Sequence, residues 1–141
     1  MSETVHATCI AIGGRGVLIR GRSGSGKSDL ALRLIDRGAQ LVSDDYTDLS
    51  EEDGRILARA PKTIAGKLEV RGVGIVEMEP AADVPVCLVV DLDQVPERLP
   101  DDSNAMSLLG TVLPAIGLVA LEPSAPVKLE QALLRFGLPL P

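Results

Sequence analysis

The feature that most constrains this chain is a glycine-rich octapeptide that follows an apolar run: Gly21-Arg22-Ser23-Gly24-Ser25-Gly26-Lys27-Ser28. Glycines let the backbone turn so that successive N–H groups point inward at phosphate oxygens. In this pattern Lys27 reaches the β- and γ-phosphates, and the Ser28 hydroxyl coordinates Mg²⁺. The octapeptide therefore predicts a nucleoside triphosphate site. The expected phosphate contacts are Gly21, Ser23, Gly24, Ser25, Gly26, Lys27 and Ser28.

The residues after the octapeptide predict a helix. Residues 29–37 repeat apolar side chains at i and i+4, and Gly38 ends the run. A helix that begins at the loop directs the positive end of its dipole at the same phosphates. The competing dinucleotide-binding pattern needs a third glycine after Gly26, but a lysine, a serine and an aspartate follow instead. The strand–loop–helix unit is thus of the triphosphate-binding kind.

Apolar runs and glycine turns mark the other expected elements. The runs 5–12 and 17–19 flank a glycine turn and predict a hairpin, and Asp53-Gly54 is a strong hairpin-turn dipeptide. The polar, proline-bearing residues 93–113 indicate a long loop or a short helix. Strands are expected at residues 39–43, 48–52, 55–60, 68–71, 75–79, 86–92 and 115–121, and a C-terminal amphipathic helix at 127–136. We therefore expect one α/β domain over residues 1–141, with a mixed sheet, a P-loop helix and a C-terminal helix.

Charge and composition narrow the classes of partner. The formal net charge is −6, the opposite of what neutralising nucleic-acid phosphates requires. Tyr46 and Phe136 are the only aromatic residues, so base-stacking platforms are lacking and the core must be aliphatic. No apolar run approaches the roughly 18 residues of a membrane helix, and the N-terminus does not resemble a signal peptide. Cys9 and Cys87 lie in apolar runs and predict buried, reduced thiols. The expectation is a cytoplasmic protein that binds neither nucleic acid nor membrane.

Two carboxylate positions could serve the magnesium ion. The pair Asp44-Asp45 and the single Asp91 each follow an apolar strand, and the pattern alone leaves the two positions even. Each could also be an ordinary turn residue at a strand end. Adjacent carboxylates can divide the work between metal binding and proton transfer, because like charges in one site raise the pKa of one member.

Three segments in order resemble the C-terminal catalytic domain of bacterial HPr kinase/phosphorylase, in its short alphaproteobacterial-type form. They are Val5-His6-Ala7-Thr8, the octapeptide with the later aspartate pair, and Leu68-Glu69-Val70-Arg71-Gly72-Val73-Gly74-Ile75. That family phosphorylates a serine of HPr, a phosphocarrier of the sugar phosphotransferase system. Its P-loop domain is related to phosphoenolpyruvate carboxykinase. The resemblance implies the same fold and an ATP- and Mg²⁺-dependent serine kinase, with phosphorolysis as the reverse reaction.

The resemblance also implies a role for each matching residue. Asp44 is expected to be the catalytic base, and Asp45 is expected to bind the metal together with Ser28. His6 is expected to lie near the phosphates and the base. Glu69 and Arg71 are expected to line the active site, with Arg71 stabilising charge on the transferring phosphoryl group. These assignments make His6, Asp44, Glu69 and Arg71 the candidate catalytic residues.

The C-terminal third departs from the family pattern. The family carries a basic, glycine- and proline-bearing segment there, whereas this chain has few basic residues after Asp91: Arg98, Lys128 and Arg135. The expected partner is HPr or an HPr-like phosphocarrier, and the family implies a homo-oligomer of hexameric type. Two alternatives remain. One is a nucleotide-sensing regulator that binds ATP or ADP without phosphoryl transfer, and the other is a small-molecule kinase.

Overall fold

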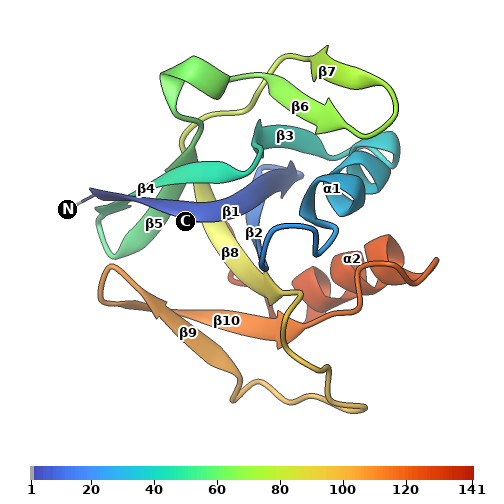
Figure 1. Cartoon of the computed structure of the whole chain (residues 1–141). Coiled ribbons are helices and arrows are strands. Elements are labelled where there is room, and N and C mark those ends of the chain that lie inside the picture. Colours follow the sequence, from blue (N-terminus) through green and yellow to red (C-terminus); the bar gives the residue numbers. More distant parts are fainter. Residues whose placement is uncertain (1) are drawn as a thin grey trace.

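The computed structural model describes residues 2–141, which form a mixed sheet covered on one side by two helices (Figure 1). The helices are α1 (Lys27–Asp36) and α2 (Ala125–Phe136), with a short 3-10 turn at Lys62–Ile64. The strands are β1 (Ser2–Ile12), β2 (Arg15–Arg20), β3 (Gln40–Ser43), β4 (Tyr46–Glu52), β5 (Arg55–Arg59), β6 (Lys67–Val70), β7 (Gly74–Glu77), β8 (Val84–Asp91), β9 (Ala105–Leu108) and β10 (Thr111–Gly117). The expected mixed sheet with a P-loop helix and a C-terminal helix is confirmed.

The main sheet curls until its strands close a ring. β1 pairs with both β2 and β4, β4 pairs with β5, β5 pairs with β8, and β8 returns to β2. The pairs β2–β8 and β8–β10 are parallel, whereas the other pairs are antiparallel. β6 and β7 form a separate hairpin above α1 in Figure 1. The parallel strands place the ends of β2, β8 and β10 side by side, the edge at which α/β proteins bind ligands.

The core is aliphatic, as the composition predicts. Along β2, Val17 and Ile19 face the layer shared with the helices, while Leu18 between them faces the interior of the ring. α1 contributes Leu30 and Leu34 to the first layer, because a spacing of four residues repeats one helix face. The buried free thiols predicted from the sequence are also observed at Cys9 and Cys87, and burial raises the pKa of Cys9 to about 12.

The predicted hairpins form where glycine or aspartate supplies a positive φ. The turn between β4 and β5 has φ of 51° at Asp53 and 77° at Gly54, the two left-handed residues of a tight hairpin turn. Gly13 and Gly14 make the corresponding turn between β1 and β2. Gly38, with φ of 108°, follows the end of α1. These turns lie within a residue or two of the positions predicted from the sequence.

The prediction of a long loop or short helix over residues 93–113 holds for the loop at 93–104 and is wrong for 105–113. Ala105–Leu108 is β9, and β10 already begins at Thr111, so the end of this segment is a hairpin. Its turn has positive φ at both Leu109 and Gly110. Leucine rarely adopts this conformation, so the usual Asn-Gly or Asp-Gly signal is absent from the sequence. The last strand also ends earlier than predicted, at Gly117 rather than residue 121.

No helix within residues 2–141 is long and apolar enough to cross a membrane.

Candidate functional site

The octapeptide forms a loop from the end of β2 to the first turn of α1. Gly24 and Gly26 have φ of 83° and 99°. Residues with a Cβ atom disfavour this left-handed conformation, whereas glycine adopts it readily. Gly26 is the N-cap of α1, and no side chain caps the helix. The first N–H groups of a helix have no acceptor within it, so those of α1 remain available to an anion at the loop. The predicted strand–loop–helix unit is confirmed.

Lys27 provides a buried positive charge at this loop. Its side chain is buried, and its Nζ donates to the carbonyl oxygens of Gly21 at 2.7 Å and of Arg22 at 3.0 Å. An ammonium group has three N–H donors, so one remains for a phosphate oxygen. No carboxylate forms an ion pair with Lys27 among residues 2–141. The charge is therefore held in place without being neutralised.

Asp44 connects the loop to the sheet. Its buried carboxylate accepts from the Ser28 hydroxyl at 2.5 Å and from the Thr8 hydroxyl at 3.2 Å, both through Oδ1. Its Oδ2 accepts from the backbone N–H of Glu69 at 3.1 Å. One carboxylate thus joins α1, β1 and β6. The hydroxyl of Ser28 and the carboxylate of Asp44 are hard oxygen donors of the kind that Mg²⁺ prefers, so these two residues fit a magnesium ion beside a triphosphate.

Asp45 takes a different position from its neighbour. It has a φ of 69°, and its side chain is 57% exposed, whereas the whole Asp44 residue is 7% exposed. The Thr8 hydroxyl accepts from the backbone N–H of Asp45, while Oδ1 of Asp45 lies 2.9 Å from Nε2 of His6. The ring of His6 lies against Tyr46, with ring centroids 5.1 Å apart. The pair therefore consists of one buried carboxylate and one accessible carboxylate held by a histidine.

A cavity of about 650 Å³ collects most of the predicted site residues. Its lining residues are Ser23, Gly24, Gly26, Lys27, Ser28, Asp29, Leu32, Asp44, Asp45, Glu69, Val70, Arg71 and Leu121. Gly21, Ser25 and His6 do not line it. Gly21 accepts from Lys27 through its carbonyl, the Ser25 hydroxyl is buried, and His6 is linked to the cavity only through Asp45.

Arg71 is the second cation of this cavity. It follows β6, is exposed, and has no hydrogen-bond or ion-pair partner within residues 2–141, so its guanidinium is free to meet an anion. Asp91, the alternative carboxylate in the sequence, does not line the cavity. Its Oδ1 instead accepts from the backbone N–H of Asp93 at 2.9 Å, as in a turn. Three residues at the site were not among the predicted site residues: Thr8, Leu32 and Leu121. Leu32 lies on α1, one turn after Ser28, whereas Thr8 and Leu121 reach the site through the pairing of β1 with β3 and of β10 with β8.

The described residues contain no cluster of three or more His, Cys, Asp and Glu side chains able to hold a metal ion by themselves. Magnesium in proteins is usually held by one or two protein oxygens together with substrate phosphates and water.

Comparison with known proteins identifies the family to which this fold belongs. The model of the HPr Serine kinase C-terminal domain matches residues 1–123. The solved structure of the Hpr(Ser) kinase/phosphatase from Coxiella burnetii superposes with a TM-score of 0.79 at 31% identity, covering 94% of each chain. The chain belongs to the HPr serine kinase C-terminal domain family.

Curated relatives of this HPr kinase family match over a shorter segment. The HPr kinase/phosphorylases of Clostridium beijerinckii and Clostridium tetani are 47% and 45% identical over 74 residues. Those residues are 52% of this chain but only 24% of each relative, so the match spans about a quarter of their length. The family match ends at residue 123, before α2 begins at Ala125. Family membership is therefore carried by the sheet, the phosphate loop and the β6–β7 hairpin.

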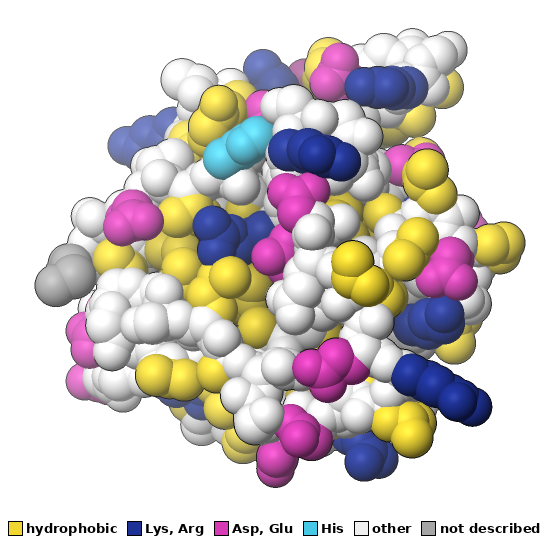
Figure 2. All heavy atoms as spheres, turned by 60° about the horizontal axis from the view of Figure 1, so that its bottom comes forward, with side chains coloured by type: hydrophobic (Ala, Val, Ile, Leu, Met, Phe, Trp, Pro, Cys, Tyr) yellow, Lys and Arg dark blue, Asp and Glu magenta, His cyan; other side chains and the backbone are white. Residues whose placement is uncertain are grey.

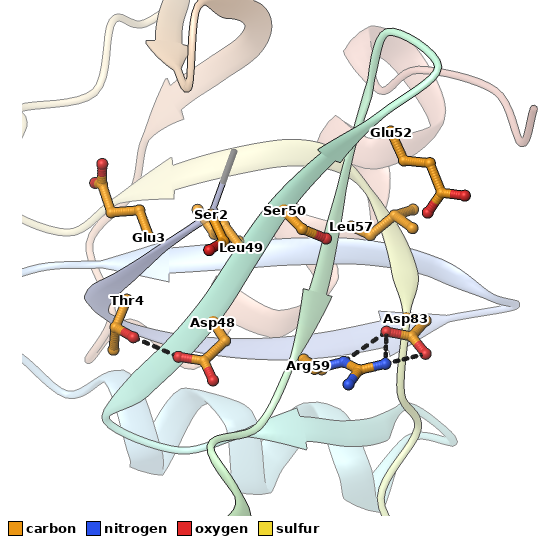
Figure 3. Close-up of a pocket in the computed structure, with 10 residues that line it drawn as sticks. All are labelled: Ser2, Glu3, Thr4, Asp48, Leu49, Ser50, Glu52, Leu57, Arg59 and Asp83. Carbon is orange, nitrogen blue, oxygen red and sulfur yellow. Dashed lines mark hydrogen bonds and ion pairs between the residues drawn. The ribbon is translucent and has the colours of Figure 1, made fainter.

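This HPr kinase family domain has a second cavity, of about 640 Å³, on β1, β4 and β5 (Figure 3). Arg59 is the single cation that lines it. Its Nε and Nη2 donate to the carboxylate of Asp83 at 2.7 and 2.5 Å. This pairing raises the pKa of Arg59. Asp48 accepts from the Thr4 hydroxyl at 2.5 Å, and Glu3 and Glu52 add further negative charge. Such a cavity is unsuited to a phosphate.

Acidic, basic and apolar side chains are interspersed over the face shown in Figure 2, and the histidine lies at the surface. No broad basic area occupies that face, in keeping with the acidic net charge.

Proposed function

We propose that this protein transfers the γ-phosphoryl group of ATP to a serine of HPr or of an HPr-like phosphocarrier. The observation that carries the proposal is the division of Asp44 and Asp45 within one cavity. Asp44 is hydrogen-bonded to Ser28 of the phosphate loop, whereas Asp45 is accessible and bonded to His6. The names of the relatives, HPr kinase/phosphorylase and Hpr(Ser) kinase/phosphatase, give the acceptor class.

The phosphate groups bind through the chain's own donors. The open N-terminus of α1 and the Lys27 ammonium hold the phosphate oxygens, and Arg71 approaches the γ-phosphoryl group from the β6–β7 side. Ser28 and Asp44 would hold Mg²⁺, which neutralises charge on the β- and γ-phosphates when bound. These contacts orient the γ-phosphorus toward the accessible carboxylate.

The transfer step assigns proton acceptance to Asp45. The serine oxygen attacks the γ-phosphorus while its proton passes to the free oxygen of the Asp45 carboxylate. The bond between the γ-phosphorus and the bridging oxygen breaks, and ADP leaves with that electron pair. His6 keeps the carboxylate oriented through its 2.9 Å contact and acts as a positioning residue. This assignment reverses the roles expected from the resemblance, because the burial of Asp44 and its bond to Ser28 favour the metal side.

A labelling experiment tests the proposal. The purified protein is incubated with radiolabelled ATP, Mg²⁺ and purified HPr, and label is followed on HPr and on an HPr variant without the acceptor serine. The expected result is label on HPr alone. Binding of ATP without transfer would support the nucleotide-sensing alternative, and the absence of any nucleotide binding would remove both functions. Adding inorganic phosphate and ADP separately to phosphorylated HPr measures whether the transfer also runs in reverse.

A further inference from the structure

The cavity of about 650 Å³ at the phosphate loop, here called the phosphate cavity, has an apolar wall that the proposed transfer step does not use. Three of its lining residues are aliphatic: Leu32, Val70 and Leu121. Leu121 lies in the connection from β10 to α2 and is 78% exposed. A single exposed leucine is ordinary on a protein surface, so its exposure alone carries no meaning. Leu121 differs from other exposed leucines in two respects: it lies against the phosphate loop, and its segment is held by hydrogen bonds.

Leu121 lies directly against the start of α1. A Cβ added at Gly26 would lie 3.8 Å from Cδ2 of Leu121 and 3.1 Å from the Cβ of Ala120. The connection that carries Leu121 follows the end of β10. β10 is parallel to β8, and β8 is parallel to β2, so the three strands end at the same edge. Ligands of open α/β sheets bind in the crevice at these strand ends. Leu121 therefore borders the crevice in which a nucleotide bound at the loop would extend.

Arg33 of α1 holds this connection in place. Its guanidinium donates to the carbonyl oxygens of Ala120 and of Glu122, the latter at 3.2 Å. Arg33 also lies 3.0 Å from Asp29 in an ion pair, without the angle of a hydrogen bond. Ala120 is buried, whereas Leu121 between the two anchored carbonyls points outward. The leucine is thus presented on a fixed segment, and its backbone N–H and C=O have no hydrogen-bond partner within residues 2–141.

The direction of a bound triphosphate favours Leu121 over Val70 as the residue at the nucleoside end. Asp44, Asp45 and Arg71 mark the γ-phosphate end, and Val70 lies in the same segment as Arg71. The β6–β7 hairpin and the start of α2 lie on opposite sides of α1 in Figure 1. The nucleoside end must then lie away from the hairpin, toward the connection that carries Leu121. Neither aromatic residue lines the cavity, so an aliphatic side chain is what remains to cover a base.

We infer that Leu121 is the nucleobase contact of the site, covering one face of the base while the adjacent free peptide groups meet its polar edge. The inference rests on the proposed nucleotide function. It assigns to the β10–α2 connection the part that aromatic side chains play in many nucleotide sites. Removing the side chain to Cβ should weaken binding of the nucleoside part and leave binding of the phosphates unchanged.

Calorimetric titration with Mg·ATP and with Mg·triphosphate, which lacks a base and a ribose, tests the inference on the full chain. Leu121→Ala should weaken ATP binding about tenfold, the effect of losing contact with one or two carbon groups, and change triphosphate binding less than about twofold. The matched control is Leu134→Ala on α2, where the leucine is 71% exposed and does not line the cavity. It should change neither affinity.

The possible results separate the inference from the proposed function. Unchanged ATP affinity in Leu121→Ala, or equal weakening of both ligands, overturns the inference and leaves the kinase proposal in place. If Leu121→Ala keeps its ATP affinity but no longer phosphorylates HPr, the inference is also overturned, and Leu121 is assigned to docking of the partner. If the unaltered protein binds triphosphate as tightly as ATP, no base contact exists. If it binds neither, the nucleotide function itself fails.

Discussion

The two cavities of this domain have almost the same volume, about 650 and 640 Å³, but opposite arrangements of charge. In the phosphate cavity, Lys27 is held by carbonyl oxygens and Arg71 has no partner within residues 2–141. In the second cavity, the guanidinium of Arg59 donates two hydrogen bonds to the carboxylate of Asp83. Volume therefore says little about which cavity binds an anion. What matters is whether a cation is fixed by neutral groups or neutralised by a carboxylate.

The sharpest test of this comparison replaces one aspartate by asparagine in each cavity and compares the two variants. Asp45→Asn should lower the rate of HPr phosphorylation by a factor of about 10² to 10⁴, the usual contribution of a general base. ATP affinity should stay close to that of the unaltered protein, because Asp45 contacts His6 rather than the phosphate loop. Single-turnover kinetics with titrated ATP measures both quantities.

Asp83→Asn is the matched control, since it removes one carboxylate from the second cavity. A comparable loss of rate in Asp83→Asn, or a normal rate in Asp45→Asn, would contradict the assignment of the base.

Replacing one cation in each cavity by methionine tests whether the local arrangement of charge controls ATP binding. Lys27→Met should weaken ATP binding about a hundredfold, because a charge-assisted contact to phosphate is lost from a buried position. Arg59→Met should leave ATP binding unchanged, because that guanidinium serves only Asp83. Equilibrium binding of a fluorescent ATP analogue distinguishes the two. Similar losses in both variants would mean that charge at a distance, rather than the local arrangement, controls affinity.

Replacing Asp44, the proposed metal ligand of the aspartate pair, is expected to have a smaller effect on ATP binding. Asp44→Asn keeps the shape of the side chain but removes its charge, so ATP binding in the presence of Mg²⁺ should weaken about tenfold. Binding measured in EDTA should be nearly unaffected. The Mg²⁺ dependence of ATP affinity, titrated for Asp44→Asn and Asp45→Asn side by side, reports which carboxylate serves the metal. A stronger Mg²⁺ effect in Asp45→Asn would restore the roles expected from the family resemblance.

The smallest expected effect concerns the ion pair of the second cavity. Both partners are about half exposed, with side-chain exposures of 57% for Arg59 and 48% for Asp83. An exposed ion pair contributes about 1 kcal/mol or less to the free energy of unfolding. A double-mutant cycle of Arg59→Met and Asp83→Asn, followed by urea denaturation, should give a coupling within that limit. A much larger coupling would indicate that this cavity is a structural centre of the ring.

Local signals in the sequence predicted much of the fold. The glycines of the octapeptide and the Asp53-Gly54 turn are readable because each residue type is suited to the φ that it adopts. The β9–β10 hairpin was missed because its turn uses Leu109, a residue whose side chain normally disfavours a positive φ. In that hairpin, strand pairing overrides the local preference.

Only those site residues that belong to local motifs could be predicted from the sequence. Lys27, Ser28 and the aspartate pair belong to motifs, whereas the contact of Thr8 with Asp44 depends on the pairing of β1 with β3. Leu121 reaches the loop only because β10 runs parallel to β8. Contacts set by strand register between distant segments leave no local pattern to read. The different burial of Asp44 and Asp45 is likewise set by the fold, and their adjacency in sequence conceals it.

The parallel pairing of β2 with β8 has a consequence for how the protein is made. The octapeptide is complete once residue 28 has been synthesised, but β2 finds its parallel neighbour only in Val84–Asp91. Pairings over such sequence separations form slowly, because the intervening chain must be ordered first. A ribosome must therefore add about sixty further residues after the octapeptide before β2 acquires its parallel neighbour. Until then β2 has only its antiparallel partner β1, and the edge of β2 that later meets β8 stays unpaired.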